Sequence, residues 1–217
     1  MENYASNYQY GGGNKKWINS FRQNFLVPFA NKIPMTATII IVTIICYLIS
    51  LISLKIYFGA AFFPPLAFLE PWRFFSAALL HADWLHLFFN MYSLWLLGAV
   101  IENALGKWKY LGLYVFSVFI GNLFAYGYAV LTGEIMILLV GASGGIFGLF
   151  GALLVLTRHI SGNTKGIMIM LGLNLVVGVL NPQISWQAHV GGFLGGALYM
   201  SIVIGILKVR NRLRKRY

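Results

Sequence analysis

Long apolar stretches, separated by short polar connections, constrain this chain more than any other feature of its sequence. Of its 217 residues, 59% are hydrophobic and 10% are charged, whereas a soluble domain typically carries about 25% charged residues. A helix needs roughly 20 apolar residues to cross the hydrocarbon core of a bilayer. We therefore predict an all-α polytopic membrane protein with six transmembrane helices, at about residues 35–54, 85–101, 110–131, 137–157, 166–180 and 186–207.

The apolar stretches divide the chain into three parts. Residues 1–34 are polar, aromatic and basic, so we expect a cytoplasmic N-terminal segment that is partly disordered and is not a cleaved signal peptide. Residues 35–207 form the membrane domain, and residues 208–217 form a basic cytoplasmic tail. The single cysteine, Cys46, cannot form an intrachain disulfide.

Basic residues are distributed unevenly between the two sides of the predicted helices. With six helices, fourteen of the sixteen lysines and arginines fall on one side, and Lys55 and Arg73 fall on the other. The positive-inside rule places the rich side, and both termini with it, in the cytoplasm. We attribute the net charge of +11 to basic residues that set the orientation in the membrane and contact anionic lipid. We expect no nucleic-acid partner.

The connection over residues 55–84 is longer than the others and rich in proline and aromatic residues. Aromatic side chains concentrate where the bilayer meets water. We therefore expect this loop to lie partly in the membrane interface.

Unusual polar residues occur near the start of each even-numbered helix. His86 and Asn90 occupy the second helix, Ser143 the fourth and His189 the sixth. Counted from the predicted helix starts, Ser143 lies roughly 9 Å and His189 roughly 5 Å below the outer surface. Polar groups inside a membrane normally face the protein interior or a water-filled cavity. The residues are therefore predicted to share one layer, where a hydroxyl and an imidazole can act as nucleophile and base.

Spacing and glycine content support this interpretation. His86 and Asn90 are four residues apart, so they share a helix face and can both donate hydrogen bonds to a developing oxyanion. Glycines recur through residues 141–151, and small residues recur every four positions over 188–196. Such patterns allow two helix backbones to approach closely, which a serine on one helix needs in order to reach a histidine on another.

Taken together, these motifs resemble those of the rhomboid intramembrane serine proteases. The matching pieces occur in the family's order over roughly residues 36–207: Trp72-Arg73, His81, His86-x-x-x-Asn90, Glu102-x-x-x-Gly106, Gly141-Ala142-Ser143-Gly144 and Ala188-His189-Val190-Gly191-Gly192. The combination is far more specific than any single piece.

The resemblance implies a six-helix rhomboid bundle with a Ser-His dyad. Ser143 would be the nucleophile and His189 the general base. The oxyanion hole would comprise His86, Asn90 and the backbone N–H of Ser143. Substrates would be single-span membrane proteins cut in or near the span, and the fifth helix with residues 181–185 would form a mobile gate.

Further residues would support the site rather than react. Trp72, Arg73 and Glu102 would be structural, and Gly141, Gly144 and Phe147 would shape the pocket. Phe147 is a departure, because tyrosine is common there in the family. Phenylalanine keeps a ring that can stack on His189, so we expect activity to survive.

The serine and the histidines could also have structural roles, or belong to another class of membrane protein. A membrane serine can simply pack helices together, and an interior histidine can be a hydrogen-bonding residue. A metal site would need a motif such as HExxH, which is missing, and a diaspartyl protease needs two aspartates where the chain has only Asp83. We expect no metal and no cofactor. A catalytically inactive relative that binds transmembrane clients, or a small transporter, remain the alternative functions, and oligomeric state and substrate stay open.

Overall fold

The computed structural model describes residues 33–160, 164–166, 168–169, 171–172 and 185–214, and its regular structure there is helical apart from one isolated bridge. Four helices are long and apolar enough to cross a membrane: α2 (Pro34–Ile52), α5 (Trp84–Leu105), α6 (Lys107–Thr132) and α9 (Trp186–Arg214). They correspond to the first, second, third and sixth predicted spans. The fourth appears as a shorter apolar helix, α7 (Ser143–Ile160). Most of the predicted fifth span, with the expected gate and the N-terminal segment, lies outside the described residues.

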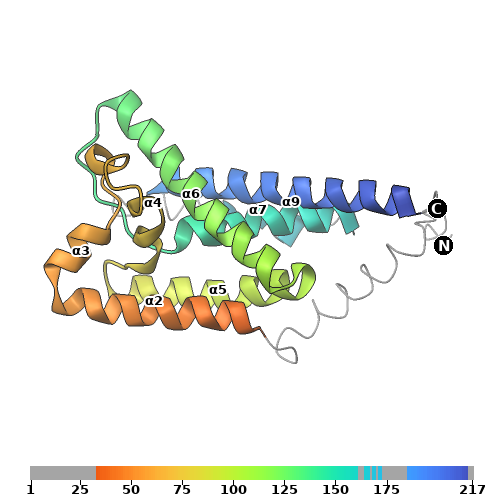
Figure 1. The fold of residues 1–217 in the computed structure, drawn as a ribbon, viewed down its shortest axis with the longest axis horizontal. Helices are drawn as coiled ribbons and strands as arrows, with labels where there is room; N and C mark the ends of the chain where they lie inside the picture. The colour runs from red at the N-terminus through yellow and green to blue at the C-terminus, as the bar shows by residue number, and fades with distance from the viewer. Residues whose placement is uncertain (1–32, 161–163, 167, 170, 173–184, 215–217) are drawn as a thin grey trace.

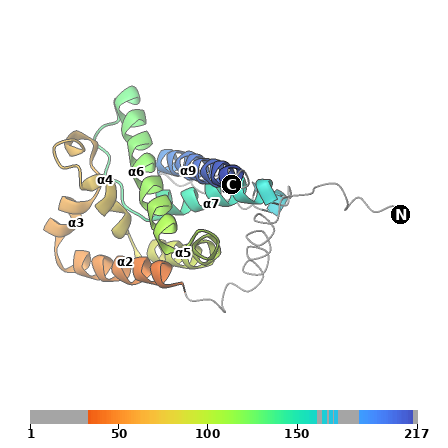
Figure 2. The same cartoon turned by 45° about the vertical axis from the view of Figure 1, so that its right-hand side comes forward.

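The helices form one bundle whose centre is α7 (Figure 1). Helices α7 and α9 run side by side, α6 crosses both at a tilt, and α2 lies along α5 (Figures 1 and 2). The short elements α3 (Leu54–Ala60), η1 (Pro64–Leu66), α4 (Arg73–Ser76) and η2 (Ala77–Leu79) cluster at one end. The last turns of α9 project from the opposite end (Figure 1). The end that carries α3 is called the loop end below.

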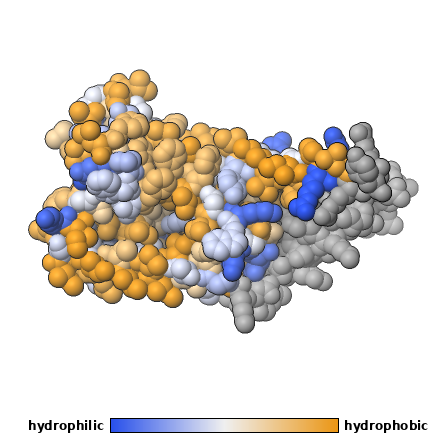
Figure 3. Space-filling view, in the orientation of Figure 1, coloured by the Kyte–Doolittle hydropathy of each residue, from blue (hydrophilic) through white to orange (hydrophobic). Residues whose placement is uncertain are grey.

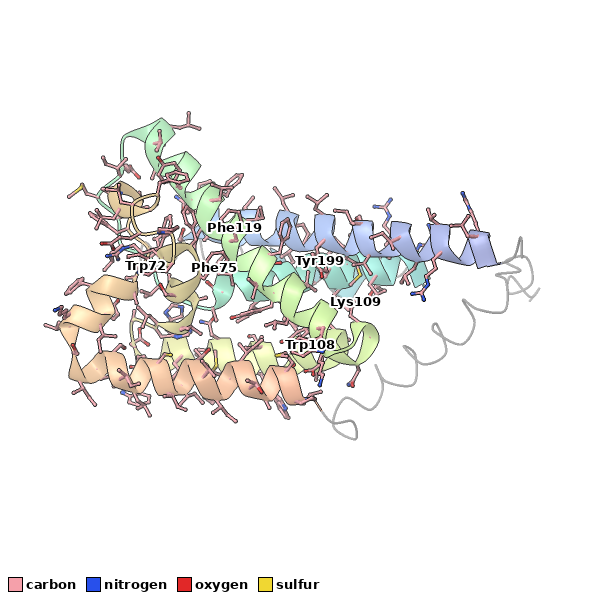
Figure 4. The ribbon with its side chains drawn as sticks, viewed as in Figure 1. Trp72, Phe75, Trp108, Lys109, Phe119 and Tyr199 are labelled. Carbon is pink, nitrogen blue, oxygen red and sulfur yellow. The ribbon has the colours of Figure 1, made fainter. Side chains whose placement is uncertain are left out.

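Apolar side chains cover much of the outside of the bundle (Figure 3). On α2 alone, Ile41, Ile45 and Ile52 are exposed, the last to 87%. Side chains of this kind on a helix surface suit hydrocarbon rather than water. Trp72 and Trp108 are exposed toward opposite ends (Figure 4), as expected of aromatic residues at the two membrane interfaces. The fold is therefore that of an integral membrane protein.

Several helix boundaries differ from the sequence prediction; for example, α9 continues past residue 207 to Arg214. Helix α5 continues past residue 101 to Leu105 because the carboxylate of Glu102 is buried against the N-terminus of α2. It accepts hydrogen bonds from the backbone nitrogens of Met35 (2.9 Å) and Thr36 (2.8 Å) and from the Thr36 hydroxyl (2.7 Å). The carboxylate of Glu102 therefore binds the free N–H groups at the start of α2, and α5 does not end at this charged residue.

The fourth predicted helix was expected from residue 137, and this was wrong, because α7 begins at Ser143. The preceding residues are extended: Leu139 pairs with Phe62 through two backbone hydrogen bonds of 2.9 Å. Gly141 then has φ +127°, which is incompatible with a helix. Ser143 is therefore the first residue of its helix rather than lying six residues into it, and the depth of 9 Å counted from residue 137 does not apply.

Close contact between α7 and α9 confirms the predicted role of small residues. A Cβ atom added at Gly192 would overlap the carbonyl oxygen of Gly144, and one added at Gly196 would overlap that of Gly148. A Cβ atom on Gly151 would overlap the carbonyl oxygen of Phe193. The two backbones are therefore in direct contact over successive turns, as small-xxx-small patterns allow.

The loop end is held by hydrogen bonds from polar side chains to backbone carbonyl groups. Arg73 is buried and donates hydrogen bonds of 2.6 Å to the carbonyl oxygens of Phe58 and Ala61, while its Nε atom bonds Glu70 at 2.5 Å. Ser76 donates to the carbonyl of Ala60 at 2.6 Å. These contacts fix α3 against α4, so the longest connection of the described chain is an ordered cap on the bundle.

Candidate active site

The candidate nucleophile and base lie on the two helices that are in backbone contact. Ser143 begins α7, and its neighbour Gly144 faces Ala188, the residue before His189: a Cβ atom on Gly144 would lie 3.6 Å from the Ala188 carbonyl oxygen. One turn after Ser143, the ring of Phe147 stacks on His189 with centroids 4.0 Å apart and planes 10° apart. The fold thus brings the two segments that carry Ser143 and His189 to the same level of the α7–α9 contact.

His189 is buried, and stacking rather than hydrogen bonding positions one side of its ring. The residue is 5% exposed, and its Nδ1 atom makes no hydrogen bond to any residue that the structure describes. In a Ser-His-Asp triad, this nitrogen is held by a carboxylate. Here the flat contact with Phe147 is the observed restraint on the imidazole.

Gly141 allows His86 to approach the serine. A Cβ atom at Gly141 would lie 2.9 Å from the Cε1 and Nε2 atoms of His86 and 3.7 Å from the Ser143 hydroxyl oxygen. With φ +127°, the position also has a conformation that few residues other than glycine adopt. His86 and Ser143 therefore approach each other across Gly141.

The loop before Ser143 is tied to the loop end of the bundle. The backbone nitrogen of Gly141 donates to the carbonyl of Ala77 at 2.9 Å. The nitrogen of Ala142 points at the Nε2 atom of His81 over 3.5 Å, a long contact. His81 is 1% exposed, and its ring centroid lies 5.0 Å from that of His86. His81 therefore supports the loop, the role expected of a structural residue.

Burial keeps His81 neutral. Its pKa is lowered to about 3, first by desolvation and then by the nearby His86, against an opposing effect of Asp83. An imidazole can accept a hydrogen bond from a backbone N–H only while one ring nitrogen is unprotonated. The low pKa of His81 is thus consistent with its place behind the Ser143 loop.

Asn90 lies one turn beyond His86 on α5 and is 7% exposed. Its side-chain nitrogen donates to the backbone carbonyl of His86 at 2.8 Å. An amide nitrogen has two protons, so this bond leaves one proton for another acceptor. Asn90 therefore sits directly behind His86 and helps to fix that turn of the helix.

A cavity of about 500 Å³ opens beside these residues. Its lining includes Ser143, Gly141, Gly144 and His86, whereas Asn90 and His189 do not line it. The volume falls in the range of about 300–1,000 Å³ that is usual for ligand sites. A hydroxyl, an imidazole and a helix N-terminus therefore border one space.

Several lining residues were missed by sequence reasoning. Leu138, Leu139 and Val140 contribute because they form an extended segment, which their apolar character disguised as part of a helix. Asn122 of α6 also lines the cavity, and its side-chain nitrogen donates to the carbonyl of Phe74 at 2.8 Å. An asparagine within an apolar span was a usable signal for this position.

Within the described part of the chain, no three His, Cys, Asp or Glu side chains gather into a group that could hold an ion. The polar groups at the cavity are instead suited to acid-base and nucleophilic chemistry.

Comparison with known proteins places the chain in a family. The Rhomboid domain matches residues 69–206, which include the loop end after residue 69, α5, α6, α7 and most of α9. YdcA of Bacillus subtilis is 39% identical over 134 residues, a match that covers 59% of this chain and 65% of YdcA. The rhomboid protease GluP of the same organism is 30% identical over 144 residues, or 64% of this chain and 27% of GluP.

A longer match is found in a more distant relative. The rhomboid protease AarA of Providencia stuartii is 28% identical over 216 residues, covering 84% of this chain and 75% of AarA. Since the family domain spans more than half of the residues and includes every segment that borders the cavity from α5 to α9, the chain belongs to the rhomboid family of membrane proteins.

Proposed function

We propose that this protein is an intramembrane serine endopeptidase that cleaves single-span membrane proteins in or near their membrane span. The observation that carries the proposal is the position of Ser143 at the first turn of α7, on a cavity wall, one turn from the Phe147–His189 stack. Family membership supports it, as GluP and AarA are named rhomboid proteases.

In the proposed reaction, the hydroxyl oxygen of Ser143 attacks the carbonyl carbon of the scissile peptide. The imidazole of His189 takes the serine proton and then gives it to the leaving amine. The product is an acyl-enzyme on Ser143. Water, activated by the same imidazole, hydrolyses the ester and releases the new carboxyl terminus.

Negative charge on the attacked carbonyl oxygen would be stabilised by groups at the start of α7. As the first residue of that helix, Ser143 has a backbone N–H with no acceptor inside the helix, at the positive end of the helix dipole. His86 reaches the same place across Gly141, and Asn90 would add a further donor. Such preorganised donors contribute about 3 kcal/mol each in acyl-transfer enzymes.

The proposed setting is a bacterial plasma membrane with both chain termini in the cytoplasm. Fourteen of the sixteen basic residues fall on one side of a six-helix arrangement, which supports this orientation. The loop end and the cavity would then face outward. Substrates would reach Ser143 from the bilayer, while water would enter through the cavity.

A serine-directed activity probe tests this proposal without knowledge of the substrate. The protein in detergent or liposomes would be treated with a fluorophosphonate probe, alongside Ser143→Ala and His189→Ala. We expect labelling of the wild type only, at Ser143 by peptide mass analysis. Absence of labelling in a folded wild-type protein, or labelling that persists in Ser143→Ala, would contradict the proposal and favour a client-binding relative without activity.

A further inference from the structure

Asp83 places a carboxylate on the wall of the cavity that contains Ser143. The residue precedes α5 at the loop end and is exposed. Among the described residues that line the cavity, it is the one with an acidic side chain, and none of them is a lysine or an arginine. The cavity therefore contains a negative group in a chain whose net charge is +11.

The local structural role of Asp83 does not require a charge. Its Oδ1 atom accepts a hydrogen bond of 2.8 Å from the backbone nitrogen of His86 and so caps α5. Serine and asparagine cap helices about as well as aspartate does. The carboxylate adds a charge, and its Oδ2 atom makes no hydrogen bond or ion pair within the described part of the chain.

Neighbouring cations do not neutralise this carboxylate. Arg73 is paired with Glu70 and with backbone carbonyls in the interior of the loop end. Lys55 lines a separate, more apolar depression of about 540 Å³ beside α3 and does not border the cavity of Ser143. A cationic group that enters the cavity thus meets an unpaired carboxylate.

We propose that Asp83 is a specificity-determining residue that favours substrates with a lysine or arginine next to the scissile bond, on the side outside the membrane. This inference rests on the proposed protease function. The substrate backbone must reach Ser143, and the cavity that it enters extends from Ser143 to Asp83. A long cationic side chain on a nearby substrate residue can therefore approach Asp83 while its peptide lies at the serine.

Reporter substrates that differ by one charge test the proposal. Purified enzyme in liposomes would cleave a set of single-span reporters that carry either lysine or glutamine at successive positions outside the span. We expect kcat/KM to be roughly two- to fivefold higher for lysine at one or two adjacent positions, which is the effect of a partly exposed ion pair. The ratio should shrink as salt is raised, because salt screens such pairs.

Matched variants separate the charge from the helix cap. Asp83→Asn and Asp83→Ser both keep a capping acceptor, and each should bring the lysine-to-glutamine ratio close to one. Glu134→Gln removes an exposed carboxylate from the loop after α6, outside the cavity lining, and should leave the ratio unchanged. Equal cleavage of the two reporters by the wild type at every position, or a lysine preference that persists in Asp83→Asn, would overturn the inference.

The same assay distinguishes the inference from the proposed function. Cleavage that depends on Ser143 but shows no charge preference would refute the role of Asp83 alone. Cleavage that persists in Ser143→Ala, or a folded wild type that cleaves no reporter, would refute both.

Discussion

The imidazole of His189 lies flat on the ring of Phe147, with a centroid distance of 4.0 Å and an interplanar angle of 10°. Because Nδ1 of His189 has no hydrogen-bond partner among the described residues, the stack is the observed restraint on the ring. Phe147 comes from the helix that begins with Ser143. The residue that orients the proposed base is thus fixed to the proposed nucleophile by a single helical turn.

Replacing the ring at position 147 should therefore impair turnover more than folding. We expect Phe147→Leu, which keeps apolar bulk but loses the flat face, to lower kcat about tenfold or more, since small misplacements of catalytic groups are costly. Phe147→Tyr keeps the face and should retain activity. Reporter kinetics with thermal melting of each variant would check this, and a Leu variant with wild-type kcat would show that stacking does not position His189.

Gly141 should not tolerate a side chain. Gly141→Ala would combine a backbone conformation that costs about 1–3 kcal/mol for other residues with crowding of His86 at 2.9 Å. We expect activity to fall by about two orders of magnitude. Gly133→Ala is a matched control, because Gly133 also has positive φ but its Cβ atom would meet nothing within 4 Å. If the two variants lost the same activity, backbone strain alone would explain the effect of Gly141→Ala.

Asn90→Ala tests the third proposed oxyanion donor. The change removes the donor that bonds the His86 carbonyl at 2.8 Å and also any donor for the reacting oxygen. We expect kcat to fall, by less than in Ser143→Ala, with KM little changed, since the donor would act mainly in the transition state. An unchanged kcat would remove Asn90 from the oxyanion hole and leave it the role of fixing α5 at His86.

Glu102→Gln should destabilise the fold without a direct effect on the site. The carboxylate accepts three hydrogen bonds at the N-terminus of α2, and bonds to a charged group contribute about 1.5–3 kcal/mol each. An amide keeps one acceptor and turns a donor toward these N–H groups. We expect a lower melting temperature in detergent, with activity per folded molecule near that of the wild type. Equal melting of the variant and the wild type would contradict this role.

Acid should destabilise the protein partly through His81. The pKa of this group is lowered from 6.5 to about 3 in the folded state, so between these values the unfolded chain binds a proton that the folded chain does not. Stability is then lost as pH falls from about 6.5 toward 3. His81→Gln should show a shallower decline than the wild type in denaturation measured across that range, and an equal decline would contradict the assignment.

The sequence predicted the membrane class because that class depends on residue type and coarse periodicity. Apolar length identifies the helices whatever their exact ends, and small residues at four-residue spacing indicate close helix contact. The predicted start of α7 failed because Leu138, Leu139 and Val140 are as apolar as a helix. Only the pairing of Leu139 with Phe62, a residue distant in the sequence, reveals that they are extended.

The end of α5 was misplaced for the opposite reason. Apolar residues alone defined the predicted span, and Glu102, which lies just beyond it, is buried by its hydrogen bonds to α2. Asn122 was detectable as a polar residue within an apolar span, whereas the place of Asp83 on the cavity wall follows only from the assembled bundle. Contacts of this kind depend on tertiary arrangement, which local patterns do not encode.

Main-chain contact between α7 and α9 has a consequence for how the protein responds to its surroundings. Gly192 and Gly196 bring their backbone against the carbonyl groups of Gly144 and Gly148, so no rotatable side chain separates the two helices there. Changes in bilayer thickness or lipid order act first on exposed apolar side chains, which on α9 include Leu198 and Ile202. The spacing between the helix segments that carry Ser143 and His189 depends on this backbone contact, so we expect it to vary little between membranes of different composition.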